Sequence, residues 1–256
     1  MTELMVQERQ AEILRRLKQE GRVVATALAS LFGVSEDTIR RDLRDMATAG
    51  LCERVYGGAL AIGPGRTTLK QRIGVAAERK KTLAAAAISL IPAQCLVYFD
   101  AGSTNLAIAE ALPDDLALTA ATNSPAIALA LQEKPLVEVI LIGGSLDRVA
   151  GGSVGARAIE AMAHIRPDLC FIGTCGIDAD GGLSAFGLED AAFKQFVAAR
   201  SRRVAVAATR EKFEVSAPYT VAAADQYHCL LTEPGIDPAR LRSVRDAGCQ
   251  IVVAGT

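Results

Sequence analysis

The sequence predicts an α/β protein built in two parts: an N-terminal helical unit that ends in a hairpin, and a C-terminal doubly wound, mostly parallel α/β domain. Three observations predict this fold. A charged helix over residues 35–46 is followed by Gly57-Gly58, which allows a tight chain reversal. From residue 82 onward, short apolar runs alternate with helical segments. Basic side chains dominate residues 1–81, whereas acidic side chains dominate residues 82–256.

Apolar residues at helical spacing predict two helices ahead of residue 35. The first spans residues 6–20, with Ile13, Leu14 and Leu17 apolar and charge elsewhere, and Gly21 ends it. The second includes residues 28–32. Because Gly33 and Val34 then form a turn, the pattern predicts a helix-turn-helix.

The third helix has one apolar and one basic face. Ile39, Leu43 and Met46 lie on one stripe at i, i+4, i+7 spacing, and Ser35 is a suitable N-cap. The opposite face carries Arg40, Arg41 and Arg44. Since a helix that buries one stripe and presents guanidinium groups on the other fits the major groove, we expect double-stranded DNA as a partner.

A hairpin follows the third helix. Residues 51–56 alternate loosely, Gly57-Gly58 reverses the chain, and residues 59–62 return antiparallel. Such a hairpin is a wing, and it brings Arg54 and Tyr56 near the sugar-phosphate backbone. We therefore predict a winged helix-turn-helix over residues 1–60. A linker is expected over residues 61–75, since it contains Gly63-Pro64-Gly65, and residues 76–256 form the second domain.

The charge of the first unit is modest. Residues 1–60 hold nine basic and nine acidic side chains, and the basic excess lies in residues 66–81. One copy should therefore attract phosphate only moderately, which favours a homo-oligomer, dimer or tetramer, on two DNA half-sites. The alternative is an ordinary helical bundle with a solvated charged face.

Composition excludes several other classes. The sequence has no signal peptide and no apolar run of transmembrane length, so we expect a cytoplasmic protein without membrane contact. Its six cysteines form no CxxC pair, and neither histidine has a spaced ligand partner. We expect reduced, buried thiols, no metal site and no cofactor.

Seven short apolar runs predict the strands of the second domain. They lack alternation, which indicates burial on both faces of a parallel sheet. The runs are residues 95–99, 117–121, 137–142, 169–172, 204–208, 229–231 and 251–253.

Small polar residues follow the first four of these runs. The residues are Asp100, Gly102, Ser103, Thr104 and Asn105; Thr122, Asn123 and Ser124; Gly143 and Gly144; and Gly173 and Gly176. Backbone N–H groups of such loops bind anions, and a helix expected over residues 106–112 adds the positive end of its dipole. Because parallel strands end at one edge, the four loops predict one anion-binding crevice.

The first unit resembles the winged helix-turn-helix of the DeoR/GlpR family of bacterial transcriptional regulators. The matching residues are Arg9, Ile13, Val34-Ser35, residues 38–43 and residues 54–59. The family usually has His at the position of Tyr56. The resemblance implies that Ser35, Thr38 and the arginines contact bases and backbone, with Arg54, Tyr56, Gly57 and Gly58 in the wing.

The second domain is similar to the effector domain of the same family. The matching segments are residues 100–105, 122–124, 142–144, 171–176 and 181–183, with Glu189 and residues 212–213. Such domains share their fold with ribose-5-phosphate isomerase and CoA transferases. The resemblance implies a repressor of a carbohydrate-catabolic operon, released by a phosphorylated sugar or sugar derivative. The loop 102–105 would hold phosphate, Asp100 and Asn123 would bind hydroxyls, and Lys212 would add positive charge.

Two segments depart from the family pattern. The family's Asp-x-Ser-Lys-Phe is replaced by residues 208–213, which keep Lys212 and Phe213 but lack the acid and the serine. The family's Thr-Asp is Thr232-Glu233. Arg210 can pair with Glu211 or contact a doubly charged ligand, and Lys212 can also be a solvated surface lysine.

Two other functions remain as alternatives. A sugar-phosphate enzyme would need a positioned base, for which Asp100, Glu189 and Lys212 are the candidates. No paired carboxylates or His–acid motif stands out, so we expect no catalytic residues. A regulator that has lost its ligand and responds to a protein partner is the third interpretation.

Overall fold

The computed structural model describes residues 6–20, 22–49, 51–60 and 67–255. The chain divides into two compact units, residues 1–67 and 68–256. The predicted linker glycines and Pro64, together with Gly21 and residues 61–62 of the hairpin, lie outside the described residues. Among the described residues, no helix combines the length and the apolarity needed to cross a membrane.

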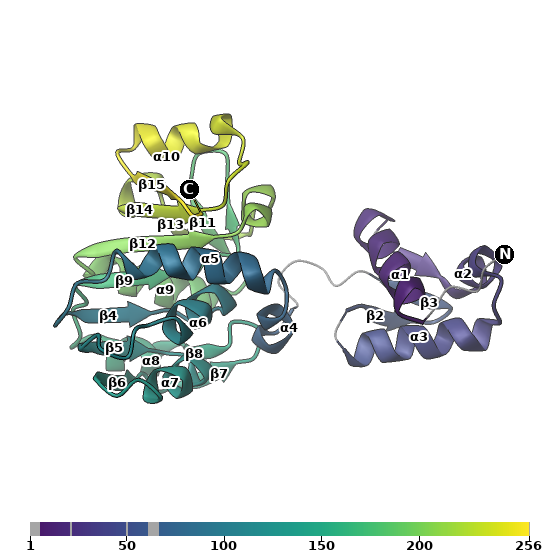
Figure 1. Cartoon of the computed structure of the whole chain (residues 1–256), viewed down its shortest axis with the longest axis horizontal. Helices are drawn as coiled ribbons and strands as arrows, with labels where there is room; N and C mark the ends of the chain where they lie inside the picture. Colours follow the sequence, from purple (N-terminus) through teal and green to yellow (C-terminus); the bar gives the residue numbers. More distant parts are fainter. Residues whose placement is uncertain (1–5, 21, 50, 61–66, 256) are drawn as a thin grey trace. The chain divides into compact units, whose positions relative to one another are not determined.

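The first unit packs three helices against a small antiparallel sheet (Figure 1). The helices are α1 (Val6–Glu20), α2 (Ala25–Phe32) and α3 (Glu36–Thr48). The strands, in sheet order, are β1 (Arg22–Val24), β3 (Gly58–Leu60) and β2 (Glu53–Val55). Its core is formed by Ile13, Leu17, Ile39, Leu43 and Met46, so the apolar stripes predicted for α1 and α3 are confirmed.

The wing differs from the prediction in one strand. Residues 22–24 form β1, which pairs with β3 on the side away from β2. Gly57 adopts the left-handed conformation expected for the reversal, at φ +81°. Gly58 instead lies in β3, where an added Cβ would come 2.0 Å from the backbone oxygen of Val23. The close approach of β1 therefore requires the second glycine. The sequence analysis did not predict β1, which has only three residues.

A seven-stranded sheet forms the centre of the second unit, and every strand pair in it is parallel. All seven predicted strands are present, and no strand end differs from the prediction by more than one residue. In sheet order they are β15 (Gln250–Val253), β14 (Cys229–Thr232), β12 (Arg203–Ala208), β9 (Leu169–Ile172), β4 (Leu96–Phe99), β5 (Leu118–Thr122) and β6 (Val137–Leu141).

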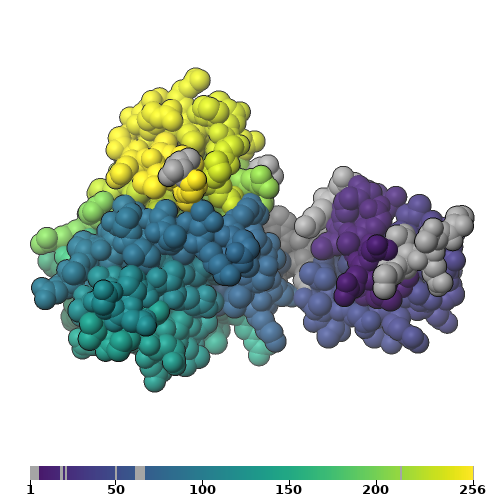
Figure 2. All heavy atoms as spheres, viewed as in Figure 1, coloured from purple at the N-terminus to yellow at the C-terminus, as the bar shows by residue number. Residues whose placement is uncertain are grey.

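Helices cover both faces of this sheet, as the doubly wound prediction requires (Figure 1). One face packs against α5 (Ala77–Ile88), α6 (Ser103–Glu110) and α7 (Pro125–Gln132). These three helices form a continuous blue and teal surface (Figure 2). The other face packs against α8 (Ala156–Met162), α9 (Leu188–Arg200) and α10 (Arg242–Asp246). Along β4, Val97 and Phe99 enter the first core and Tyr98 enters the second.

Several smaller elements were not predicted. They are α4 (Leu69–Ile73), the hairpin β7 (Ser145–Asp147) with β8 (Gly152–Val154), the antiparallel sheet of β10 (Gly176–Ile177), β11 (Leu183–Ala185) and β13 (Tyr219–Ala222), and the short 3-10 helices η1 (Arg210–Glu214), η2 (Ala224–Gln226) and η3 (Pro238–Leu241). The helix expected over residues 106–112 begins earlier, at Ser103. Ser103 and Thr104 therefore belong to its first turn, where backbone N–H groups have no intrahelical partner.

Candidate functional site

Helix α3 presents its arginines to solvent. Ile39, Leu43 and Met46 are buried, whereas Arg40, Arg41 and Arg44 are exposed. Ser35 caps the helix, accepting a hydrogen bond from the backbone N–H of Thr38 at 3.2 Å, as predicted. The two hydroxyls, Ser35 Oγ and Thr38 Oγ1, also lie 2.9 Å apart. The start of the helix is thus ordered by its own side chains.

The three arginines differ in their partners. Arg40 pairs with Glu36 at 2.9 Å and with Asp37 at 3.5 Å. Within the described parts of the chain, Arg41 and Arg44 form no ion pair. Two guanidinium groups on the exposed face are therefore available to a polyanion, while the charge of Arg40 is balanced locally.

The wing presents the other predicted DNA-facing residues. Arg54 is exposed on β2, and Tyr56 is fully exposed at the turn beside Gly57. An aromatic side chain without any covering surface is unusual for a protein in isolation. Together with the arginines of α3, these residues give the first unit a polar and basic surface suited to a duplex.

Arg9 was matched to the family pattern without a role, and the structure supplies one. Arg9 Nε donates to Asp42 Oδ2 at 2.5 Å, and Arg9 NH2 donates to Asp42 Oδ1 at 3.2 Å. The pair joins α1 to the buried side of α3, so these two charges hold the recognition helix in place.

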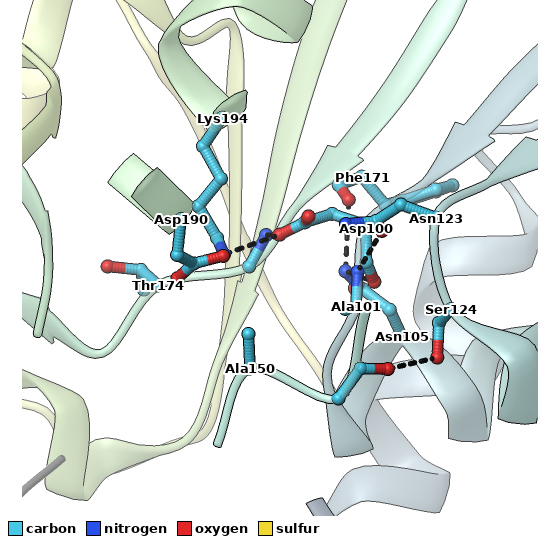
Figure 3. A network of polar contacts seen from close by, with 12 residues as sticks. Asp100, Ala101, Asn105, Asn123, Ser124, Ala150, Phe171, Thr174, Asp190 and Lys194 are labelled. Carbon is cyan, nitrogen blue, oxygen red and sulfur yellow. Dashed lines mark hydrogen bonds and ion pairs between the residues drawn. The ribbon is translucent and has the colours of Figure 1, made fainter. Parts of the chain in front are cut away.

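In the second unit, a buried ionic group lies where β4 and β9 end (Figure 3). Asp100 Oδ2 accepts a hydrogen bond from the backbone N–H of Gly173 at 2.8 Å and lies 3.3 Å from Lys194 Nζ. Lys194 also pairs with Asp190, one turn earlier on α9. Asp100 Oδ1 is buried and has no hydrogen-bond partner among the described residues. A ligand hydroxyl is one group that can supply the missing donor.

The charged side chains of this group shift one another's pKa values. Burial raises the pKa of Asp100 to about 6, although Lys194 opposes the shift. Burial alone would lower the pKa of Lys194, but the carboxylates of Asp100 and Asp190 together raise it above its ordinary value. Lys194 and Asp190 were not predicted as site residues. Their spacing of four along a helix is a weak signal, because most such pairs are solvent-exposed.

Four predicted effector contacts are instead tied to the protein itself. Asn105 donates to the carbonyls of Asp100 and Phe171, both at 2.9 Å, and Thr122 donates to Phe99 at 2.7 Å. Asn123 accepts from the N–H of Ala101 at 3.1 Å (Figure 3). It also donates to the carbonyl of Ser153 at 2.9 Å. Ser124 donates to Gly151 at 2.9 Å.

All four side chains are buried, and both the oxygen and the nitrogen of the Asn123 side-chain amide form hydrogen bonds within the protein. Their geometry supports positioning of the loops around Asp100 rather than direct contact with a ligand. The sequence could not distinguish these roles, because the same small polar residues serve both.

Ser103 and Thr104 remain half-buried in the first turn of α6, directly after Gly102. In the described residues, neither hydroxyl has a hydrogen-bond partner, so both can donate to an anion together with the N–H groups of the turn. In this part of the predicted phosphate loop, the hydroxyls of Ser103 and Thr104 are therefore free to donate to an anion.

The two helices α4 and α5, which pack against α6, each carry a cation. Helix α4, which contacts α6, carries Arg72, and Arg72 donates to the carbonyls of Val149 and Ala150. Lys80 Nζ donates to the carbonyl of Arg72 at 2.5 Å. Burial and the charges of Lys212, Arg72 and Arg79 lower the pKa of Lys80 to about 8.

Lys212 belongs to the same group, since its pKa is lowered by burial and by the charges of Arg72 and Lys194. It is half-buried, so the interpretation as a solvated surface lysine is wrong. We refer to Arg72, Lys80, Lys194 and Lys212 as the cation cluster. Within this cluster, neighbouring positive charges lower the pKa values of Lys80 and Lys212, and a bound anion would relieve that repulsion.

The remaining predicted residues occupy different surroundings. Gly173 lies against Asp100, where an added Cβ would come 2.7 Å from Oδ2. Gly176 is packed against the backbone of Val215 and is buried, whereas Gly143 and Gly144 are exposed beyond β6. Glu189 is exposed at the start of α9, with a carboxylate oxygen 3.6 Å from the Cβ position of Gly155.

Comparisons with known proteins agree with these two units. Residues 9–64 match the DeoR-like helix-turn-helix domain, and residues 75–234 match the DeoR C terminal sensor domain. The chain is 30% identical over 255 residues to the transcriptional repressor CsqR of Escherichia coli K12, covering 99% of this chain and 97% of that protein. It is 32% identical over 207 residues to the glycerol-3-phosphate regulon repressor of the same strain, covering 80% of this chain and 82% of that protein.

Among solved structures, ribose 5 phosphate isomerase A from Neisseria gonorrhoeae is similar at a TM-score of 0.41 and 17% identity, over 54% of each chain. The match to both domain families spans most of the described structure, in the order helix-turn-helix and then sensor domain. This chain belongs to the DeoR family of transcriptional regulators, and it is a DNA-binding regulator rather than an enzyme.

Proposed function

We propose that the protein represses a carbohydrate-catabolic operon and leaves its operator when a phosphorylated sugar or sugar derivative binds the second unit. The single observation that carries the proposal is the cation cluster, two of whose members lie on helices that pack against α6 and its free first turn. The similar protein from E. coli is named a glycerol-3-phosphate regulon repressor, which supports an effector of the same chemical class.

The phosphate is assigned to the N–H groups and hydroxyls of Ser103 and Thr104, with Lys80 and Lys212 as counter-ions. Three or four charge-assisted hydrogen bonds of this kind account for selective binding of a dianion. The sugar part then lies toward Asp100, whose unpartnered Oδ1 accepts a hydroxyl. Arg72 lies on α4 (Leu69–Ile73), at the start of the second unit.

On DNA, Arg41 and Arg44 contact base edges or phosphates, and Arg54 and Tyr56 contact the backbone. The neutral charge balance of residues 1–60 supports a homo-oligomer on two half-sites, since two weakly attracted units bind far more tightly when joined. An effector can bind one arrangement of the two units more tightly than the other. The ratio of these two effector affinities limits how much the effector changes the affinity for DNA.

The test is fluorescence anisotropy of full-length protein with DNA from its own promoter region and with random DNA of equal length. Sugar phosphates and sugar alcohol phosphates are then added singly. We expect a clear preference for promoter DNA, and its loss with one of these compounds. Equal affinity for the two DNAs would rule out the repressor, while release by none of the compounds would rule out the proposed effector class.

A further inference from the structure

A second pocket lies apart from the Asp100 crevice, at the ends of β12, β14 and β15. Its volume is about 280 Å³. Its polar lining consists of Arg79 and Thr82 from α5, Arg210 from η1 and Glu233 after β14, and Ala254 and Gly255 complete the wall. Nothing in the proposed function uses these side chains.

Glu233 is the buried polar group of this pocket. Its side chain is only 8% exposed. Oε2 accepts from Arg79 at 3.0 Å and from the backbone N–H of Arg210 at 2.7 Å. Oε1 is buried without a hydrogen-bond partner among the described residues. Because a buried acceptor without a partner is costly, a donor from a bound molecule would satisfy it.

Arg210 supplies a cation at the edge of the same pocket. Its side chain is 64% exposed, and its only ion pair in the described structure is with Glu211, at 3.9 Å. Glu211 is already engaged by Arg79 at 2.5 Å. The guanidinium of Arg210 therefore remains available for bidentate pairing with a carboxylate.

Arg79 joins the two acids of this region. Its guanidinium pairs with Glu211 at 2.5 Å and with Glu233 at 3.0 Å. The backbone N–H of Arg210 also donates to Glu233, so the same carboxylate holds both arginines at the pocket.

We propose that this pocket is a second ligand site, separate from the sensor crevice, and that it takes a small hydroxy acid. A hydroxyl of the ligand donates to Glu233 Oε1, and its carboxylate pairs with Arg210. The small side of the pocket at Ala254 and Gly255 accommodates the carbon chain. Helix η1 carries both Arg210, which lines this pocket, and Lys212, which belongs to the cation cluster. One turn of η1 therefore connects the pocket to the cation cluster.

The test is isothermal titration calorimetry of the full-length protein with D-gluconate as the probe. Gluconate has a carboxylate and several hydroxyls, whereas D-glucitol has the hydroxyls alone. We expect one gluconate per chain and at least tenfold weaker binding of glucitol. The proposal is overturned if no gluconate binding is detected at concentrations up to about 50 mM, because weaker binding is too weak to assign to a site.

Two variants locate the binding. Arg210→Ala changes an exposed side chain, and Glu233→Gln keeps the size of a buried one, so both should retain the circular dichroism spectrum of the parent protein. We expect at least tenfold weaker gluconate binding in each. Arg202→Ala is the matched control, because it removes an exposed arginine at the opposite end of β12. Gluconate binding that survives R210A but is lost in S103A would place the acid in the sensor crevice and overturn the proposal.

Discussion

Arg9 and Asp42, 33 residues apart in the sequence, form a bidentate ion pair that is almost fully buried between α1 and α3. The pair lies on the side of α3 opposite its exposed arginines. It thereby fixes the rotation of α3 about its own axis, with Ile39 and Leu43 inside and Arg41 outside. In the proposed DNA complex, this pair would set which side chains of α3 face the duplex without contacting DNA itself.

Loss of one partner of this pair should unfold the first unit more easily. Arg9→Met leaves the buried carboxylate of Asp42 without its cation, which costs about 3–5 kcal/mol. The double variant Arg9→Met with Asp42→Asn should be more stable than Arg9→Met alone, because the carboxylate charge is then removed. Urea denaturation followed by circular dichroism measures this. Glu12→Gln, which breaks the two partly exposed pairs of Glu12 with Arg15 and Arg16 on α1, is the control and should change the transition far less.

The arginines of α3 should contribute unequally to DNA affinity. Arg41→Ala and Arg44→Ala remove free guanidinium groups, and each should weaken operator binding by about 1–3 kcal/mol. Arg40→Ala should cost less, since Glu36 and Asp37 already balance that charge. Anisotropy titrations over a range of salt concentrations test this. Equal losses for all three would show that Arg40 leaves its acidic partners on DNA.

Most of the fold, but less of the site, follows from sequence. The seven strands were predictable because the apolar runs are too short for helices and most are followed by small polar residues or glycine. Asn123 and Ser103 were not distinguishable, since both are small polar residues after a strand. Only the structure shows that Asn123 binds Ala101 and Ser153, whereas Ser103 is free. Lys80 and Lys194 were missed because a lysine on a helix is ordinarily solvated, and only packing reveals its burial.

Effector affinity should fall as pH rises through 8. Lys80 must be charged to bind phosphate, and its pKa is lowered to about 8 in the free protein. A phosphate ester is dianionic above neutral pH, so the ligand itself adds little change. Between pH 7.5 and 9 the charged fraction of Lys80 decreases roughly eightfold, and affinity should decrease by up to that factor. In Lys80→Met, calorimetry should find weaker binding that varies less over this interval, with Lys212 as the remaining lysine whose pKa is lowered.

Lys194→Met should destabilise the second unit in a pH-dependent way. Without the ammonium group, Asp100 and Asp190 are left as buried carboxylates, at a cost of about 3–5 kcal/mol when both are ionised. The pKa of Asp100 is already raised to about 6 and should rise further in the variant. Protonation relieves the repulsion, so the deficit should be larger at pH 8 than at pH 5. Urea transitions at both pH values measure it, and an equal deficit would contradict the assignment.

Two sets of variants should distinguish residues that contact the ligand from residues that position the loops. Ser103→Ala and Thr104→Ala remove free hydroxyls, so each should weaken effector binding by about 1 kcal/mol or more while the thermal midpoint of the free protein stays unchanged. Thr122→Val removes the donor to Phe99 and the acceptor for the N–H of Ser124 inside the core. It should lower the midpoint, because it leaves buried backbone groups unpaired. Thermal denaturation with and without effector distinguishes the two. A Ser103 variant that lost stability but kept its affinity would move the phosphate site away from the first turn of α6.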